Sequence, residues 1–387
     1  MAESVAERYV RLGLQVGRHV DGIVDAYFGP AELAAAVEAA PSVEPRALVA
    51  AADALLAELT DGWLRDQVVG LRTYSGVLAG EARSYADEVQ GCYGVRPVHT
   101  DESVFEAAHG RLEELLPGTG PLAERYQRWR DSTLVPGDRV ERTVAAVIEL
   151  AREQTRGLVA LPAGEGVDLE IVHDEPWLGF NLYLGDLRGR ISVNVDLPMS
   201  ALDLLHLAIH ETYPGHQAER VLKEHLLVRG RGLLEETLVL VPTPQCLVSE
   251  GIGRLAPRLL LDGDGGPALA AAVTRDSGVE FDLARVLAVS RAAEPLGWAH
   301  VNAALMLHEA GAGEAETRAY LERWALHDPG VSAHLIRFLT EPASRTYAIN
   351  YPAGLELCGS FVAGDPDRFR RLLTEQVRVR DLLETAG

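Results

Sequence analysis

Helical periodicity runs through most of this sequence, and one short block of alternating residues interrupts it. From Ser4 to about Phe28, apolar residues recur mostly at steps of three and four, which places them on one face of a helix that Gly29 and Pro30 would close. Alanine- and leucine-rich segments predict further helices at about 31–40, 46–59, 62–89, 101–115, 120–131 and 137–160, with a break in the third near Gly70 or Gly80 as an alternative. The chain up to about residue 160 is therefore expected to be helical throughout.

The pattern changes at about Asp168. Three runs of alternating residues, rich in β-branched and aromatic side chains, are typical of strands: 169–173, 180–184 and 191–195. We expect a small antiparallel sheet at about 168–196, with residues 185–189 as a hairpin turn. Pro198 ends it, and Ser200 can cap a strongly apolar helix. Later helices are predicted at about 252–261, 267–274, 280–293, 297–310, 314–326, 330–340 and 366–384.

These patterns predict a mainly α protein with one small sheet. The 387 residues, of which 47% are hydrophobic, suffice to bury a large core. No linker or repeat divides the chain, so we expect one domain over 1–387. It would have an N-terminal helical half at about 1–160, a second half at 161–387, and a cleft between them.

Charge and cysteine content restrict the possible partners. The formal net charge of -21 would repel nucleic-acid phosphates and anionic membranes, so neither is an expected partner. Three cysteines, Cys92, Cys246 and Cys358, show no spacing of a disulfide framework. The N-terminus lacks the basic start and apolar run of a signal peptide. We therefore expect a cytoplasmic protein with buried thiols; its oligomeric state stays open.

One motif carries the chemistry, His210-Glu-Thr-Tyr-Pro-Gly-His216, with Glu250 downstream. A catalytic zinc needs about three protein ligands, commonly histidines and a carboxylate, and keeps one position for water. His210 and His216 supply two imidazoles, and Glu250 is the candidate third ligand. Glu211 is the candidate base, because a carboxylate that does not bind the metal can take a proton from that water.

The spacing of the two histidines is the difficulty. In a regular helix, residues six apart lie about 120° from one another, so His210 and His216 could not reach one ion. Pro214 and Gly215 lie between them and can end or bend the helix. The zinc hypothesis depends on that bend. If the helix is straight, His206 and His210, one turn apart, become the better pair; otherwise His206 supports a ligand or is a core residue.

The motif also carries a resemblance. With Ser249-Glu250-Gly251 it resembles the H-E-x-x-P-G-H and E-G signature of the bacterial family labelled domain of unknown function 885. Tyr351-Pro-Ala-Gly354 is similar to a Tyr-x-x-Gly element of that family, and Ala26-Tyr-Phe-Gly-Pro30 to an element of its shorter members. That family more distantly resembles gluzincin-type helical zinc peptidases of the thimet oligopeptidase and carboxypeptidase Taq families.

The resemblance implies roles for particular residues. His210, His216 and Glu250 would hold zinc, and Glu211 would act as the general base. A tyrosine near the C-terminus often donates a hydrogen bond to the oxyanion in such enzymes, which makes Tyr351 or Tyr347 the candidate. Arg345 would bind a substrate carboxylate, although it can equally pair with one of the many acids. The chain departs from the family at two positions, Gln217 and Ile252, where histidine and tryptophan are common.

The predicted function is zinc-dependent hydrolysis of peptide or amide bonds, with short peptides as substrates. An exposed strand of the small sheet could align an extended peptide over the metal. Two alternatives remain open at this point. The same two histidines and carboxylate can hold iron for oxidative chemistry. In the other, the protein is a metal-stabilised binding protein in which Glu211 is only structural.

Overall fold

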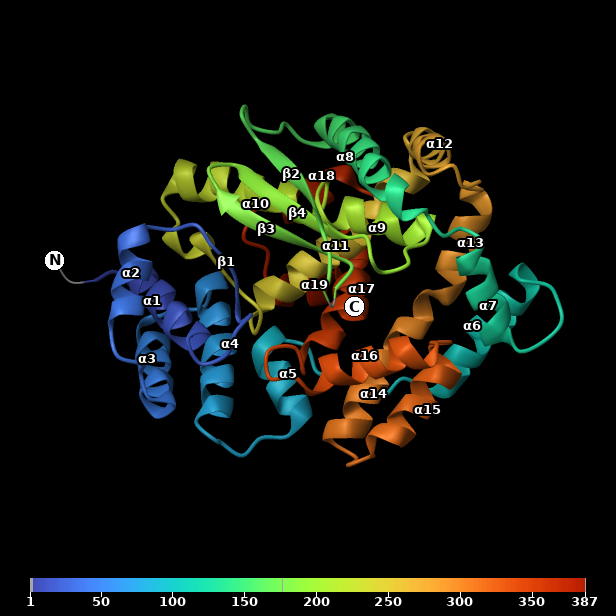
Figure 1. Cartoon of the computed structure of the whole chain (residues 1–387). Helices are drawn as coiled ribbons and strands as arrows, with labels where there is room; N and C mark the ends of the chain where they lie inside the picture. The colour runs from blue at the N-terminus through green and yellow to red at the C-terminus, as the bar shows by residue number, and fades with distance from the viewer. Residues whose placement is uncertain (1–2, 176, 387) are drawn as a thin grey trace.

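Helices form most of the molecule in this computed structural model, which describes residues 3–175 and 177–386 (Figure 1). The first half contains α1 (Val5–Gly17), α2 (Ala31–Ala39), α3 (Pro45–Glu58), α4 (Trp63–Leu78), α5 (Tyr85–Tyr93), α6 (Glu102–Leu115), α7 (Leu122–Asp131) and α8 (Gly137–Leu158). The second contains α9 (Ala201–Glu211), α10 (His216–Lys223), α11 (Pro244–Asp262), α12 (Gly266–Ser277), α13 (Leu283–Ala293), α14 (Trp298–His308), α15 (Glu314–Trp324), α16 (Pro329–Thr340), α17 (Asn350–Val362), α18 (Pro366–Thr374) and α19 (Val379–Ala386). The predicted fold class, mainly α with a small sheet, is confirmed.

The long first helix was predicted wrongly. α1 ends at Gly17, and the chain then turns back so closely that a β-carbon on Gly17 would lie 2.6 Å from the Val24 side chain. Residues Val24–Tyr27 form a strand, β1, which pairs antiparallel with β5 (Leu238–Leu240). A partner strand more than 200 residues away thus overrides the local helical periodicity.

The mid-chain sheet lies where it was predicted, but one pairing differs. Its strands β2 (Gly166–Val172), β3 (Gly179–Gly185) and β4 (Arg188–Asn194) are ordered β2-β4-β3. β3 and β4 form the expected antiparallel hairpin, whereas β2 and β4 are parallel, which corrects the all-antiparallel prediction. Two exposed ion pairs link these parallel strands, because Arg188 and Arg190 of β4 pair with acids of β2 at 2.5 and 3.7 Å.

The helix α11 is buried along most of its length and lies in the middle of the molecule (Figure 1). It packs closely on α17, because Gly251 faces the backbone of Gly354: a β-carbon on Gly251 would lie 2.5 Å from the Gly354 carbonyl oxygen. α17 was not predicted from the sequence. This close contact brings residues of the C-terminal region beside Glu250.

The motif helix α9 has its own apolar support. Its Ser200 side chain caps the first turn, as predicted, and accepts a hydrogen bond from the Asp203 amide. Leu204, Leu205 and Ile209 are fully buried in a core shared with α8 and α12. The face that carries His206 and His210 is less buried, and it is turned toward α11.

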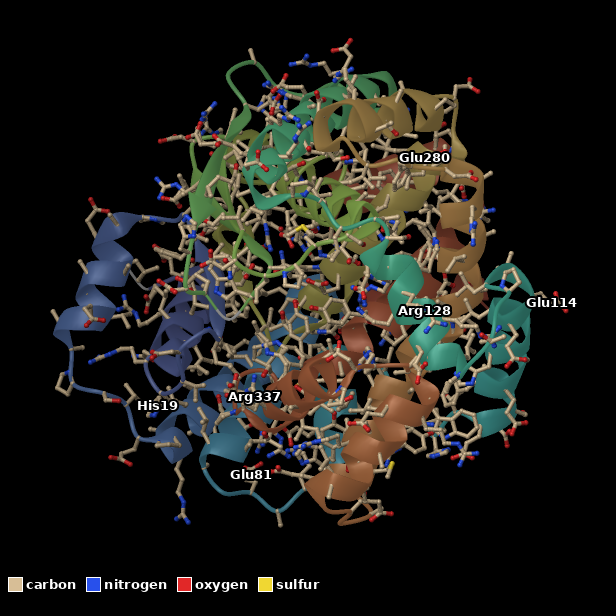
Figure 2. All side chains as sticks on the ribbon, turned by 45° about the vertical axis from the view of Figure 1, so that its right-hand side comes forward. His19, Glu81, Glu114, Arg128, Glu280 and Arg337 are labelled. Atoms are coloured by element: carbon tan, nitrogen blue, oxygen red, sulfur yellow. The ribbon has the colours of Figure 1, made fainter. Side chains whose placement is uncertain are left out.

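Charged side chains cover the outside of the molecule. Figure 2 labels five of them, Glu81, Glu114, Arg128, Glu280 and Arg337, and all five are exposed. None of the helices in the described part of the chain is both long and apolar enough to cross a membrane. The three cysteines are buried and free, as expected.

Candidate metal centre

The turn between His210 and His216 ends the first motif helix before it reaches His216. α9 stops at Glu211 and a new helix, α10, starts at His216. Gly215 lies so close to the end of α9 that a β-carbon on it would be 1.9 Å from the carbonyl oxygen of His210. The prediction that Pro214 and Gly215 interrupt the helix is confirmed. His216 therefore starts a second helix instead of lying on the far side of the first.

The structure brings the three predicted metal ligands together. One ligand atom from each of His210, His216 and Glu250 lies within 4.8 Å of the others. His210 Nε2 is 3.5 Å from Glu250 Oε2, and His216 Nε2 is 3.3 Å from Glu250 Oε1. The two imidazole rings are nearly perpendicular, with centroids 4.5 Å apart. Three elements, α9, α10 and α11, thus each contribute one candidate ligand.

These residues fit a zinc ion in geometry and in chemistry. Tetrahedral ligands at about 2.0–2.1 Å from zinc lie roughly 3.4 Å from one another, close to the two distances between histidine Nε2 atoms and Glu250. Glu250 Oε2 is buried and makes no hydrogen bond to any residue that the structure describes. A buried carboxylate oxygen without a partner is costly, so its position favours a cation as the missing partner.

A buried chain of hydrogen bonds supports His216 on the Nδ1 side of its ring, and the sequence analysis did not predict it. The Ser249 hydroxyl lies 3.1 Å from His216 Nδ1 and donates to Glu219 Oε2 at 2.5 Å. Lys223 donates to the other oxygen of Glu219 at 2.7 Å. Only the i,i+4 spacing of Glu219 and Lys223 was visible in the sequence. These hydrogen bonds orient the imidazole ring of His216 so that its Nε2 faces Glu250.

Glycine makes room for the other ligand. A β-carbon on Gly253 would lie 2.6 Å from the His210 ring, so only glycine leaves space for that imidazole beside α11. His206 does not join the three ligands. Burial and then the charge of Arg254 lower the pKa of His206 to about 4, so it is neutral.

Glu211 lies next to the ligands. Its Oε1 is 3.9 Å from His210 Nε2, and Asn181 of β3 donates to its backbone carbonyl at 2.9 Å. Burial, with the charges of Glu250 and Asp25, raises the pKa of Glu211 to about 7. A carboxyl group with that pKa can both accept and return a proton near neutral pH.

The three residues proposed to contact the substrate lie in different settings. Tyr347 donates to Glu250 Oε1 at 2.7 Å, so it orients a ligand. Tyr351 packs against Tyr347 with the two rings tilted and their centroids 5.5 Å apart, and it lines a cavity. Arg345 instead donates to the buried Glu88 at 2.8 Å, which is the ion-pair alternative of the sequence analysis. Its charge is thus already neutralised by an acid of α5.

The ionisation of the ligands predicts how zinc binding depends on pH. Burial opposes charge on His216, but the hydrogen bond and charge of Glu250 outweigh it and raise the pKa of His216 to about 9 in the metal-free protein. Zinc needs the neutral imidazole, so binding must release this proton. We expect zinc affinity to rise about tenfold per pH unit between about pH 6 and 8, and to level off above about pH 9.

Competition with a chelator at several pH values would measure this dependence. Calorimetry in two buffers of different ionisation enthalpy would count the protons, and about one proton per zinc is expected near pH 7. An affinity that does not change with pH, together with no proton release, would contradict the assignment of His216.

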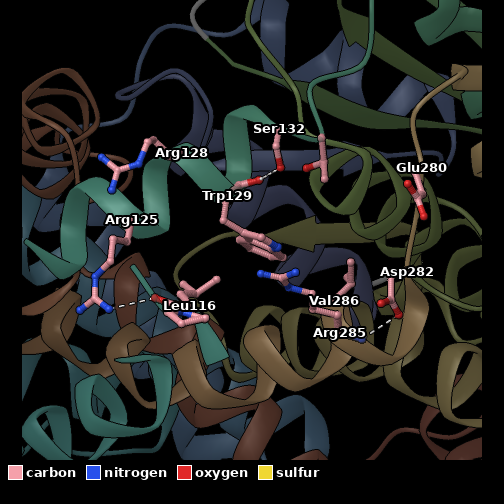
Figure 3. A pocket seen from close by; sticks show the side chains of 11 residues that line it. Leu116, Arg125, Arg128, Trp129, Ser132, Glu280, Asp282, Arg285 and Val286 are labelled. Atoms are coloured by element: carbon pink, nitrogen blue, oxygen red, sulfur yellow. Dashed lines mark hydrogen bonds between the residues drawn. The ribbon is translucent and has the colours of Figure 1, made fainter. Parts of the chain in front are cut away.

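A second cavity lies apart from these ligands. It has a volume of about 550 Å³ and is lined by Arg125, Arg128 and Trp129 of α7 and by Asp282 and Arg285 at the start of α13; Figure 3 shows Trp129 next to Arg285. Arg125 already donates to the Leu116 carbonyl at 2.9 Å. None of the predicted site residues lines this cavity, neither a metal ligand nor Glu211, Tyr347, Tyr351 or Arg345, so it does not belong to the candidate site.

Solved structures that resemble this fold include two bacterial proteins. A candidate lipoprotein from Colwellia psychrerythraea matches with a TM-score of 0.57 and 16% identity, covering 88% of this chain and 66% of its own. A candidate lipoprotein of unknown function from Shewanella oneidensis matches with a TM-score of 0.53 and 14% identity, covering 96% and 69%. This chain thus spans about two thirds of each neighbour, and at these identities the likeness concerns the fold alone.

No protein-family model matches the chain, and no curated protein matches it. The resemblance to the domain of unknown function 885 family therefore stays a prediction, based on its motifs.

Proposed function

We propose that this protein is a zinc-dependent hydrolase of peptide or amide bonds, and that it belongs to the domain of unknown function 885 family. The observation that carries the proposal is the unpaired, buried Glu250 Oε2, which faces His210 Nε2 at 3.5 Å beside a second histidine. A carboxyl group suited to proton transfer, Glu211, lies directly next to these ligands.

The metal ligands, Glu211 and Tyr351 have different roles in the proposed hydrolysis. A zinc ion held by His210, His216 and Glu250 would supply Lewis acidity toward a carbonyl group and lower the pKa of a water molecule. Glu211 accepts the proton of the attacking water and donates it to the leaving nitrogen. Burial, with the charges of Glu250 and Glu211, raises the pKa of Tyr351 well above its usual value, so its hydroxyl stays a hydrogen-bond donor.

An edge strand lies beside the candidate base, which supports a peptide as the substrate. β3 is at the edge of its sheet, and Asn181 in this strand is bonded to Glu211. The backbone groups on such an edge can pair with an extended peptide. A peptide bound there would run past Glu211 toward the ligands, which favours short, unfolded substrates.

Removing the hydroxyl group of Tyr351 is expected to affect catalysis, whereas removing that of Tyr347 is expected to affect zinc binding. Tyr351→Phe should lower kcat about 100-fold with zinc content unchanged, because it removes an oxyanion donor. Tyr347→Phe should lower zinc affinity about tenfold, because Glu250 loses its orienting bond. Steady-state kinetics and chelator competition would measure both, with Tyr126→Phe on α7 as the control. The assignment is wrong if Tyr351→Phe loses zinc or if Tyr347→Phe binds it normally.

A peptide-library digest tests the function itself. Protein purified without chelator is analysed for metals and incubated with the library, before and after zinc removal, and mass spectrometry identifies the products. Cleavage that depends on stoichiometric zinc and is absent in His210→Ala supports the proposal. Stoichiometric iron with oxygen consumption would replace it by an oxidative enzyme, and intact peptides with bound zinc would leave a metal-stabilised binding protein.

We further propose that the protein acts in the cytoplasm. Cys92, Cys246 and Cys358 are all buried and free, as expected in a reducing compartment. The name lipoprotein belongs to the two structural neighbours, and it is not carried over to this chain.

A further inference from the structure

A cavity of about 810 Å³ opens beside the proposed metal centre. Tyr351 of α17 and Arg254 of α11 form part of its lining, and both come from the helices that frame Glu250. Part of the wall is apolar: Trp298 and Phe338 contribute aromatic surface, and Leu355 adds an aliphatic side chain. Polar side chains, among them His300 and Glu294, line the rest. Such a cavity fits one or two amino-acid residues with apolar side chains.

Arg254 has an unusual position for an arginine. It lies one helical turn after Glu250, at the i,i+4 spacing that puts both side chains on one face of α11. The residue before it, Gly253, lies against His210, because a β-carbon on Gly253 would be 2.6 Å from that imidazole ring. Arg254 therefore directly follows the part of α11 that contacts the candidate ligands.

Arg254 also lacks an acidic partner. Its side chain is exposed and makes no hydrogen bond or ion pair with any residue in the described ranges. The next arginine along this face, Arg258, is paired with Glu294. The remaining acid of the lining, Glu356, makes no ion pair with Arg254. In a protein with a net charge of -21, an arginine left free at a cavity mouth is a ready site for an anion.

We propose that Arg254 binds the free C-terminal carboxylate of a short peptide, and that the cavity receives its apolar last side chain. The protein would then be a carboxypeptidase or dipeptidase, a conclusion that rests on the hydrolase function proposed above. Guanidinium groups bind carboxylates through paired, charge-assisted hydrogen bonds, which fixes the distance between the peptide end and the metal. The arginine thus determines which bond is cut.

The reaction balances without any further reactant. Water forms a new C–O bond at the carbonyl carbon, and the C–N bond to the last residue breaks. One proton of the water passes through Glu211 to the leaving nitrogen, and the released amino acid keeps its carboxylate on Arg254. Arg345, which the sequence analysis proposed as the residue that binds a substrate carboxylate, is already hydrogen-bonded to Glu88.

Matched peptides test the proposal. Zinc-loaded protein is given peptides with an apolar last residue as free acids and as C-terminal amides, together with amidated peptides that end in glutamate. We expect the free acids to be cleaved at least about 100-fold faster than either amide. In Arg254→Met, kcat/KM for the free acids should fall about 100-fold, mostly through KM, with zinc content unchanged. Arg254→Lys should recover part of the loss, and the surface variant Arg128→Met should behave like the wild type.

Binding separates failure of this inference from failure of the hydrolase function. Calorimetry with zinc-loaded Glu211→Gln measures the affinity for the free-acid and amidated peptides without requiring turnover. The role of Arg254 is supported if Glu211→Gln binds the free acid more tightly than the amide and if this difference disappears in the double variant with Arg254→Met. This result counts even if no peptide is cleaved. Equal cleavage and binding of acids and amides, or fast cleavage of the amidated glutamate peptide, would overturn it.

Discussion

Glu211→Gln is expected to reduce peptide hydrolysis by a factor of about 10² to 10⁴ while zinc stays bound. The substitution keeps the shape of the side chain but removes the group that accepts and returns the proton. Glu211 is not one of the three ligands, and its Oε1 lies 3.9 Å from His210 Nε2, so the metal centre should keep its geometry. The burial that raises the pKa of Glu211 to about 7 also means that a neutral amide is tolerated there without loss of stability.

The measurement is kcat/KM together with zinc content determined by mass spectrometry of the metal. Glu114→Gln, at an exposed position of α6, is the control and should match the wild type. Full activity of Glu211→Gln at full zinc occupancy would mean that Glu211 is only structural. Loss of zinc in this variant would instead make Glu211 part of the metal-binding set.

The second large effect is expected at the turn between the motif helices. In Gly215→Ala, the new methyl group would lie 1.9 Å from the His210 carbonyl oxygen and 2.6 Å from that of Ile209. Neither backbone atom can move without shifting the end of α9, and such a shift carries His210 away from His216. We expect a loss of about 3 kcal/mol or more in unfolding free energy and at least about a hundredfold loss in zinc affinity.

Urea unfolding of the metal-free protein and chelator competition would measure these losses. The matched control is Gly110→Ala in α6, where a β-carbon would meet nothing within 4 Å. That variant should gain roughly 0.5–1 kcal/mol, because alanine loses less backbone entropy in a helix. If Gly215→Ala unfolds and binds zinc like the wild type, close packing at the turn is not what positions the two histidines.

Much of the fold could be predicted because helix formation depends mainly on residues that are close together in the sequence. Side chains three and four residues apart share a face, so apolar periodicity located α3, α6 and α8 within about two residues. The prediction failed where the partner is distant. β1 was read as the end of a helix because its partner β5 lies more than 200 residues away. α17 was missed for a related reason, since its packing depends on a close contact between Gly251 and Gly354.

The candidate site divides in the same way. His210, Glu211, His216 and Glu250 could be named from their chemistry and order along the chain. The support behind them could not, because Ser249, Glu219 and Gly253 act through contacts across helices. Arg345 and Arg254 illustrate the limit: both are arginines of the second half, and only the structure pairs one with Glu88 and leaves the other at the cavity.

By itself, the sequence determined the helical class, the position of the small sheet, and the set of residues able to hold a metal. Those properties depend on residue type and on spacing within about two helical turns. Only the tertiary structure decided whether the two histidines, six residues apart, face one point. That outcome depends on a backbone turn at Gly215 and on an imidazole fitted against Gly253, both of which are close contacts between separate helices.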